Sequence, residues 1–439
     1  AKSYFPVETI RFWPLGRRVK LVVFFCLCAG VAHALPNSIL GVLGVSNSPL
    51  DDEDLTEEFL VGAGWHDDGG LPGRWVPGVA TDYSEERYLM ARPKIFGVET
   101  ILVKATRRGE ELEELQVTFA DAGSFFGYYQ EEKVPKNLSR KEAIAEMRRL
   151  MTIRQTEFKE LYQDRLEKLE KELKKRSGKA RGAQRGRTRA LRAEMTEFQI
   201  DDRTVRLLSA PDRLLRLSIR RKGKIPGSWL DQSAEKVSPS TRLRGLAQKA
   251  QRSENGDVIL NEVPIVPQGY RPYCGLNTLT MVARYLGLNL DEDWLAVAGK
   301  FQNTGSAAGS DMMGLYKAVA KEAGLSMDRS RDYSHATVRR SLQAGMPVIV
   351  WRRWGQDRDR LHTRISRDIE DGGKSKFPAL DFKTLPNAES PLHASVLVGF
   401  NDGRKEVLFL ESWAGQTKPR RMPVAELDAT AYYTFSFRP

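Results

Sequence analysis

The chemistry that this sequence can support centres on Cys274. The 439 residues include three cysteines, and the other two, Cys26 and Cys28, lie in an apolar stretch near the amino terminus. Pro267 and Pro272 keep the residues before Cys274 out of regular structure, and a stripe of apolar residues after it predicts a helix. Cys274 is therefore expected at the start of a helix, where unpaired backbone N–H groups and the helix dipole favour a thiolate over a thiol.

Three further side chains could complete an acyl-transfer site. His393 precedes a buried apolar run, and a neutral imidazole can both form an ion pair with a thiolate and protonate a leaving group. Glu411 follows the next expected strand, where it could orient the imidazole ring. Gln268 carries a side-chain NH2 group, which together with the backbone N–H of Cys274 could stabilise an oxyanion.

The motifs around these residues resemble those of a known family. Gln-x5-Cys-Gly at a helix start, a later His-Ala-Ser-Val-Leu-Val-Gly-Phe and then Glu-Ser-Trp-Ala-Gly are similar to the papain-like cysteine peptidases, in particular to the bacterial C39-like branch of bacteriocin-leader peptidases. The resemblance implies that Cys274 attacks, His393 acts as base and acid, Gln268 completes the oxyanion hole and Glu411 occupies the third position.

The sequence departs from the family pattern in two places. The residues around Cys274 are not the papain-type Cys-Gly-Ser-Cys-Trp, and Glu411 is longer than the Asn or Asp that orients the histidine in the family. Asn401 and Asp402 are alternative third residues. The resemblance covers about residues 263–413, with an apparent insertion over residues 352–391, and it gives no information on the amino-terminal half.

Each of these residues also has a purely structural interpretation. Cys274 could be a buried, inert thiol, and His393 could be a hydrogen-bonded core residue. Glu411 could be a carboxylate at a strand end, and Trp413 could pack in the core rather than over the site. The order and spacing of the motifs together favour the catalytic interpretation.

Composition and periodicity predict an α+β protein with several domains. Ser139 and Glu142 form a capping-box signature, from which a long charged helix runs to about residue 176; residues 177–186 read as a flexible basic break and residues 188–198 as resumed helix. The predicted segments are a signal peptide (1–34), a small mixed domain with an antiparallel sheet (35–136), the long charged helix with a basic break and a hairpin (137–221), a linker (222–257) and a papain-like cysteine hydrolase domain (258–439).

The first residues predict export. Basic residues precede an apolar run over residues 21–31, and Ala32-His33-Ala34 offers a cleavage site. The run is shorter than the roughly 20 residues that span a bilayer, so no stable membrane span is expected after cleavage. The expected location is periplasmic or extracellular, and Cys274 would be the one thiol of the mature chain.

The formal net charge of +12 is concentrated between about residues 140 and 224. Residues 140–192 could bind nucleic acid, but their interspersed glutamates and the scarcity of aromatic residues for stacking favour a solvated helical arm, through which a protein partner could bind. His66, His335, His362 and His393 show no metal-ligand spacing, so the sequence predicts neither a metal nor another cofactor.

The leading hypothesis is an exported thiol hydrolase that cleaves a peptide or isopeptide bond through a thioester on Cys274. A transglutaminase-like acyl transfer would use the same residues with an amine as acceptor. A third hypothesis is a catalytically inactive papain-like binding module at the cell envelope, with the helical arm serving assembly.

Overall fold

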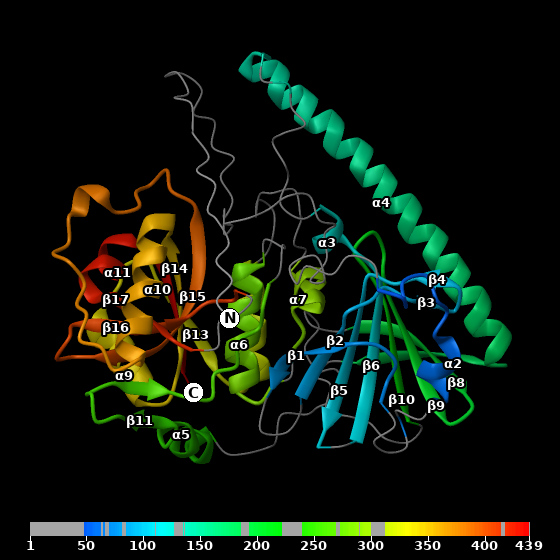
Figure 1. Cartoon of the computed structure of the whole chain (residues 1–439), viewed down its shortest axis with the longest axis horizontal. Helices are drawn as coiled ribbons and strands as arrows, with labels where there is room; N and C mark the ends of the chain where they lie inside the picture. The colour runs from blue at the N-terminus through cyan, green and yellow to red at the C-terminus, as the bar shows by residue number, and fades with distance from the viewer. Residues whose placement is uncertain are drawn as a thin grey trace, which may run out of the picture.

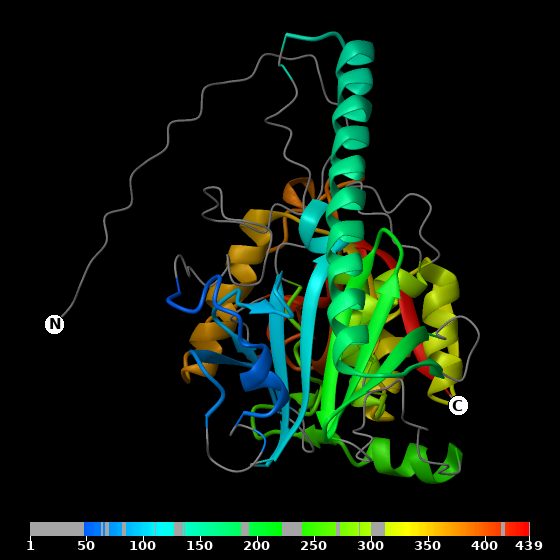
Figure 2. The ribbon, with the colours of Figure 1, turned by 90° about the vertical axis from the view of Figure 1, so that its right-hand side faces the viewer.

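The structure, a computed structural model, shows two sheets with helices between and around them (Figures 1 and 2). It describes residues 48–438 except 63–64, 66–69, 81–84, 110, 127–134, 136, 186–192, 222–238, 269–272, 289, 300–311 and 414–417. The predicted signal peptide, His66 and residues 222–238 of the predicted linker lie outside the described residues.

The amino-terminal domain is built on one antiparallel sheet of eight strands, ordered β1-β2-β5-β6-β10-β9-β8-β7. This sheet joins the two segments, 35–136 and 137–221, that the sequence analysis treats separately. Its strands are β1 (Trp75–Ala80), β2 (Glu85–Leu89), β5 (Leu102–Arg108), β6 (Glu111–Asp121), β7 (Ala180–Arg185), β8 (Ala193–Ile200), β9 (Arg203–Ala210) and β10 (Leu214–Arg221). A small ribbon, β3 (Lys94–Ile95) with β4 (Val98–Glu99), and two short helices, α2 (Thr56–Leu60) and α3 (Ala122–Phe126), complete it.

The hairpin predicted within residues 137–221 is confirmed, because β9 pairs with β10. β5 pairs with β6 in the antiparallel sheet predicted for residues 35–136. Two other local predictions are wrong. The expected basic break and resumed helix are instead the strands β7 and β8, which pair with each other. Pairing of β8 with β9 buries Phe198 and Ile200 in the domain core, and this tertiary packing outweighs the helix propensity of the local sequence.

The predicted long charged helix is confirmed as α4 (Arg140–Arg176). Ser139 and Glu142 form the expected capping box, with Ser139 N donating to Glu142 Oε2 over 2.9 Å. The buried side chains of the helix all lie in its second half, which packs on the sheet, whereas its first half extends beyond the sheet (Figure 2). None of the helices in the described part of the chain is long and apolar enough to span a membrane.

The carboxy-terminal domain surrounds a second antiparallel sheet, ordered β11-β12-β15-β14-β18-β13, with β16 paired to β15 and β17 to β16. Its strands are β11 (Ala250–Arg252), β12 (Val258–Leu260), β13 (Ser326–Ser330), β14 (Val348–Arg353), β15 (Leu392–Asn401), β16 (Glu406–Leu410), β17 (Arg420–Pro423) and β18 (Ala431–Arg438). Its helices are α5 (Pro239–Ala247), α6 (Cys274–Tyr285), α7 (Glu292–Ala298), α8 (Met312–Glu322), α9 (His335–Gln343), α10 (Gln356–Glu370), the 3-10 turn η4 (Phe382–Thr384) and α11 (Val424–Thr430).

Two features of this domain differ from the sequence expectations. The predicted linker interval contains α5 and β11, and β11 adds a strand to the carboxy-terminal sheet through β12. The apparent insertion after β14 contains the 15-residue helix α10, which packs on β17. Gly399 in β15 permits the close pairing with β12, because a Cβ there would lie 2.5 Å from the carbonyl oxygen of Val258.

The two domains pack against each other through α6 and α7, which lie between the two sheets in Figure 1. Arg216 of β10 pairs with Asp291, the N-cap of α7, and Arg284 of α6 lies 3.3 Å from Glu86 of β2. These four charged side chains are buried and line a cavity of about 40 Å³. Apolar side chains of β8, β9 and β10 join the carboxy-terminal core beside it, so the interface is both apolar and ionic.

Candidate active site

Cys274 is the first residue of α6, as the sequence predicts. One face of the helix is anchored in the core by apolar side chains such as Leu276 and Leu279, which are fully buried. Asn277 donates its side-chain amide to the carbonyl of Val266 over 3.0 Å, which ties the preceding loop to the helix. The Cys274 thiol is half-buried, at the end of the helix where the backbone N–H groups point outward.

His393 lies in β15 and contacts Cys274, so the fold brings together two residues more than a hundred positions apart. The side chains of His393 and Cys274 are joined by a hydrogen bond. The imidazole is buried, and its Nε2 atom lies 2.6 Å from Oε2 of Glu411. Because Nε2 faces the carboxylate, Nδ1 is the ring nitrogen on the side of the thiol.

Glu411 directly follows β16 and is fully buried. Burial alone would raise its pKa, but His393 and the guanidinium groups of Arg352 and Arg420 lower that pKa to about 2. Burial likewise disfavours the charged form of His393, yet the Glu411 carboxylate and Cys274 outweigh it and raise the pKa of His393 to about 9. At neutral pH the pair is therefore a carboxylate and an imidazolium.

Gln268 is held beside the site by Ser412. The backbone N–H of Gln268 donates to the carbonyl of Ser412 over 2.8 Å, and the Ser412 hydroxyl donates to the Gln268 side-chain oxygen over 2.6 Å. In this orientation the side-chain oxygen of Gln268 faces Ser412, and its NH2 group points away from Ser412. An amide NH2 group is the kind of donor that stabilises an oxyanion.

Gly275, the residue after Cys274, does not border open space. A Cβ at this position would lie 3.3 Å from the Met312 side chain, 3.7 Å from the Tyr316 hydroxyl and 3.9 Å from Trp351. Tyr316 donates its hydroxyl to the Gly275 carbonyl over 2.7 Å. The glycine therefore permits close packing of α8 and β14 against the start of the nucleophile helix.

Asn401 and Asp402, the alternatives to Glu411 for orienting His393, contact other residues. Asn401 bonds to Asp257 over 2.7 Å, and Asp402 pairs with Arg339 over 2.9 Å. Trp413 is half-buried with its ring centroid 5.1 Å from that of His393, so it forms a wall against the imidazole. Of the candidates, Glu411 is the carboxylate in contact with His393.

Comparison with known proteins agrees with this geometry. Residues 260–438 match the sequence model of the Peptidase_C39 like family. The carboxy-terminal domain is a C39-like domain. A crystal structure of a Bacillus anthracis protein described as a C39-like peptidase is also similar, with 18 % sequence identity, a TM-score of 0.29, and coverage of 42 % of this chain and 98 % of that one. No curated protein matches the sequence.

The C39-like domain also contains buried polar residues that the sequence analysis missed. Arg352, at the end of β14, donates to Glu411 over 2.8 Å, and Ser395 donates to the same carboxylate over 2.9 Å. His362, expected only as part of a hydrophilic insertion, is fully buried in α10 with Nε2 2.8 Å from Glu426. An arginine at the end of an apolar strand, such as Arg352, is a sequence signal for a buried ion pair. Nothing in the neighbouring residues indicates which carboxylate the arginine pairs with.

No group of three or more His, Cys, Asp or Glu side chains is arranged to hold a metal ion within the described ranges. Cys274, His393 and Glu411 are the kinds of group that nucleophilic catalysis by a thiol uses. A thiolate at a helix amino terminus can attack a carbonyl carbon, and an imidazolium beside it can donate a proton to the leaving group.

Proposed function

We propose that the chain is an exported cysteine peptidase that hydrolyses peptide or isopeptide bonds through a thioester on Cys274. The proposal is carried by one observation: the Cys274 thiol, the His393 imidazole and the Glu411 carboxylate form a continuous chain of contacts at the amino terminus of α6. The match of residues 260–438 to a peptidase family supports a peptide or protein substrate.

The reaction follows from these groups. The Cys274 thiolate attacks the substrate carbonyl carbon, forming a C–S bond while the oxygen becomes an oxyanion near the Gln268 amide and the Cys274 N–H. His393 then gives its proton to the leaving nitrogen as the C–N bond breaks, which leaves a thioester. His393 next removes a proton from water, whose oxygen attacks the thioester; the C–S bond then breaks, which releases the acid and restores the Cys274 thiolate beside the imidazolium.

Turnover of a peptide library by wild type and by Cys274→Ala tests this function. Wild type should release products whose masses add up to that of the substrate plus one water, and the variant should release none. Products joined to an added amine would instead indicate acyl transfer. Matched folding of the two proteins, without cleavage or transfer by either, would support the non-catalytic binding module.

Export is the second part of the proposal, and it rests on the basic and apolar pattern of residues 1–34. Expression with these residues in a bacterial host, followed by amino-terminal sequencing, should give a mature protein that begins at Leu35. An uncleaved protein in the cytoplasm would refute this part without affecting the peptidase proposal.

We also propose that the first half of α4 contacts a protein partner. This half contains no buried side chain, and Ile153 exposes 40 % of its surface there. A photo-crosslinker at position 153 should give a discrete adduct in living cells, whereas one at Tyr162, which is buried on the sheet, should not. Equal behaviour of the two positions would refute a docking role for this half.

A further inference from the structure

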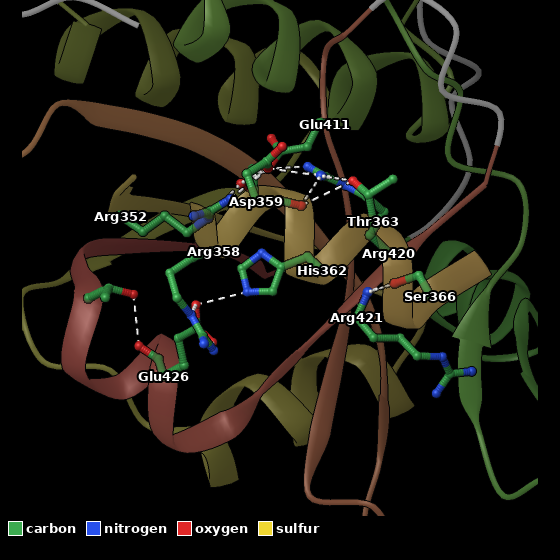
Figure 3. A network of polar contacts seen from close by, with 12 residues as sticks. Arg352, Arg358, Asp359, His362, Thr363, Ser366, Glu411, Arg420, Arg421 and Glu426 are labelled. Carbon is green, nitrogen blue, oxygen red and sulfur yellow. Dashed lines mark hydrogen bonds and ion pairs between the residues drawn. The ribbon is translucent and has the colours of Figure 1, made fainter. Parts of the chain in front are cut away.

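The helix α10 is connected to the active site through Arg420, whose Nη1 donates to two of its side chains. Asp359 and Thr363 lie one turn apart on α10, and both accept from Nη1 of Arg420, over 2.8 Å and 3.0 Å respectively. The guanidinium stands between two aromatic rings, 5.0 Å from the Phe409 centroid and 4.7 Å from the Trp413 centroid. Four side chains from three segments therefore fix its position, as Figure 3 shows for the α10 contacts.

The other end of this guanidinium faces the active-site carboxylate. Nη2 of Arg420 lies 3.3 Å from Oε1 of Glu411, and both side chains are buried. Arg352 and Ser395 donate to the same oxygen atom, from β14 and β15. Oε1 therefore accepts two hydrogen bonds and forms an ion pair with Arg420, while Oε2 is directed at His393 over 2.6 Å.

This division of the two oxygens has a geometric consequence. A glutamate has one more rotatable bond than an aspartate, so its carboxylate needs more contacts to stay in one orientation. Two hydrogen-bond donors and one ion pair on Oε1, from three strands, restrict rotation about the terminal bond of the side chain. Arg420, which forms the ion pair, is itself anchored in the segment between β14 and β15.

We propose that Arg420, which donates hydrogen bonds to Asp359 and Thr363 of α10, is a positioning residue that holds Glu411 toward His393. The segment between β14 and β15 is then part of the support of the active site rather than a peripheral insertion. The inference rests on the proposed function for the role of Glu411, but its test measures the thiol itself and needs no substrate.

Arg421 supplies a matched control. It is the next residue of β17 and is similarly buried, with 7 % of its surface exposed against 4 % for Arg420. Its guanidinium pairs with Asp257 and Glu406 rather than with Glu411, and Figure 3 shows its side chain pointing away from that site. Substitution at either position removes a buried ion pair, and substitution at position 420 alone changes the surroundings of Glu411.

The experiment compares wild type with Arg420→Lys, Arg420→Met, Arg421→Lys and Arg421→Met in the full chain. The rate of Cys274 alkylation by iodoacetamide is measured as a function of pH, and denaturant unfolding is measured in parallel. Loss of Arg420 removes a cation near the thiolate and imidazolium pair and frees Glu411 to rotate, and both changes disfavour the thiolate. The acid limb of the alkylation profile should therefore move to higher pH.

For Arg420→Met we expect a shift of about half a pH unit or more, which is a roughly threefold loss of alkylation rate on the acid side. Arg420→Lys should shift the limb in the same direction by less, and neither Arg421 variant should shift it. If Arg420→Met does not fold, the two lysine variants decide the question. The proposal would be overturned if folded Arg420 variants kept the acid limb of the alkylation profile at its wild-type pH. It would also be overturned if the Arg420 and Arg421 variants shifted that limb equally.

The failure of the proposed function would look different. A wild-type profile with a single ionisation at the ordinary thiol pKa of about 8.5 would show that Cys274 is not activated, and it would overturn the catalytic role and the positioning role together. An activated wild-type thiol with unchanged Arg420 variants would overturn the positioning role alone.

Discussion

The charge of Glu411 sets the protonation of His393, and Glu411→Gln tests this directly. The amide keeps the size of the side chain and one oxygen acceptor, but it removes the negative charge that raises the pKa of His393 to about 9. Without that charge, burial disfavours the imidazolium. We therefore expect the pKa of His393 to fall to its ordinary value of 6.5 or below.

The size of the effect depends on pH in a defined way. At pH 7, an imidazole with a pKa of about 9 is about 99 % protonated, and one with a pKa of 6.5 is about 24 % protonated, a roughly fourfold difference. At pH 8 the two fractions are about 91 % and about 3 %, a roughly thirtyfold difference. The imidazolium is the form that protonates the leaving group, so the activity loss should deepen as pH rises.

The assay is kcat/KM across this pH range with a cleaved library peptide, and iodoacetamide alkylation serves where no substrate is yet in hand. The alkaline limb of wild type should lie near pH 9 and that of Glu411→Gln at least about two units lower. Glu406→Gln is the matched control, because Glu406 is a buried carboxylate of β16, the strand that Glu411 follows, and it pairs with Arg404 and Arg421. A pH-independent loss in Glu411→Gln, or an equal limb shift in Glu406→Gln, would refute the reasoning.

Three further outcomes are expected. Gly345→Ala should lower the free energy of unfolding by about 3 kcal/mol or more, because the backbone there has φ +77° and the new Cβ would clash with the backbone of α5. Gly287→Ala is the control: its backbone has φ +85° but its Cβ would face open space, so it should cost about 1 to 2 kcal/mol in the same denaturant titration. Arg216→Met should cost about 3 to 5 kcal/mol by leaving its buried partner in α7 unpaired, and limited proteolysis should then separate the two domains more readily. Ser412→Ala should lower kcat about tenfold with little change in KM, because it releases the amide of Gln268 without removing this donor, whose loss would cost a hundredfold or more.

Local sequence was sufficient for features whose cause is local. The capping box at Ser139 and the helix that begins at Cys274 both depend on neighbouring residues, and the structure has both elements. The strands β7 and β8 were missed because their stability comes from pairing with each other and with β9. Periodicity cannot register such pairing when the local residues also favour a helix or a break.

The residues of the candidate site likewise fall into two groups, those that local motifs predict and those that depend on strand pairing. Cys274, His393 and Glu411 follow from motifs that each occupy a few residues, and the fold brings them into contact. Arg352 and Arg420 have no motif, because their function in the fold depends on a register between strands: Arg352 stands opposite His393 in the pairing of β14 with β15. A single sequence contains no information on that register beyond the apolar pattern of the strands.

The burial of Glu411 gives a physical reason for these arginines. Glu411 is fully buried, and a buried carboxylate is tolerated only when it is paired and hydrogen-bonded. A neutral asparagine at that position would make no such demand. The departure of Glu411 from the family pattern and the presence of Arg352 and Arg420 around it are therefore two sides of one electrostatic requirement: a longer, charged orienting residue needs cations that balance its charge and contacts that hold its carboxylate toward the imidazole.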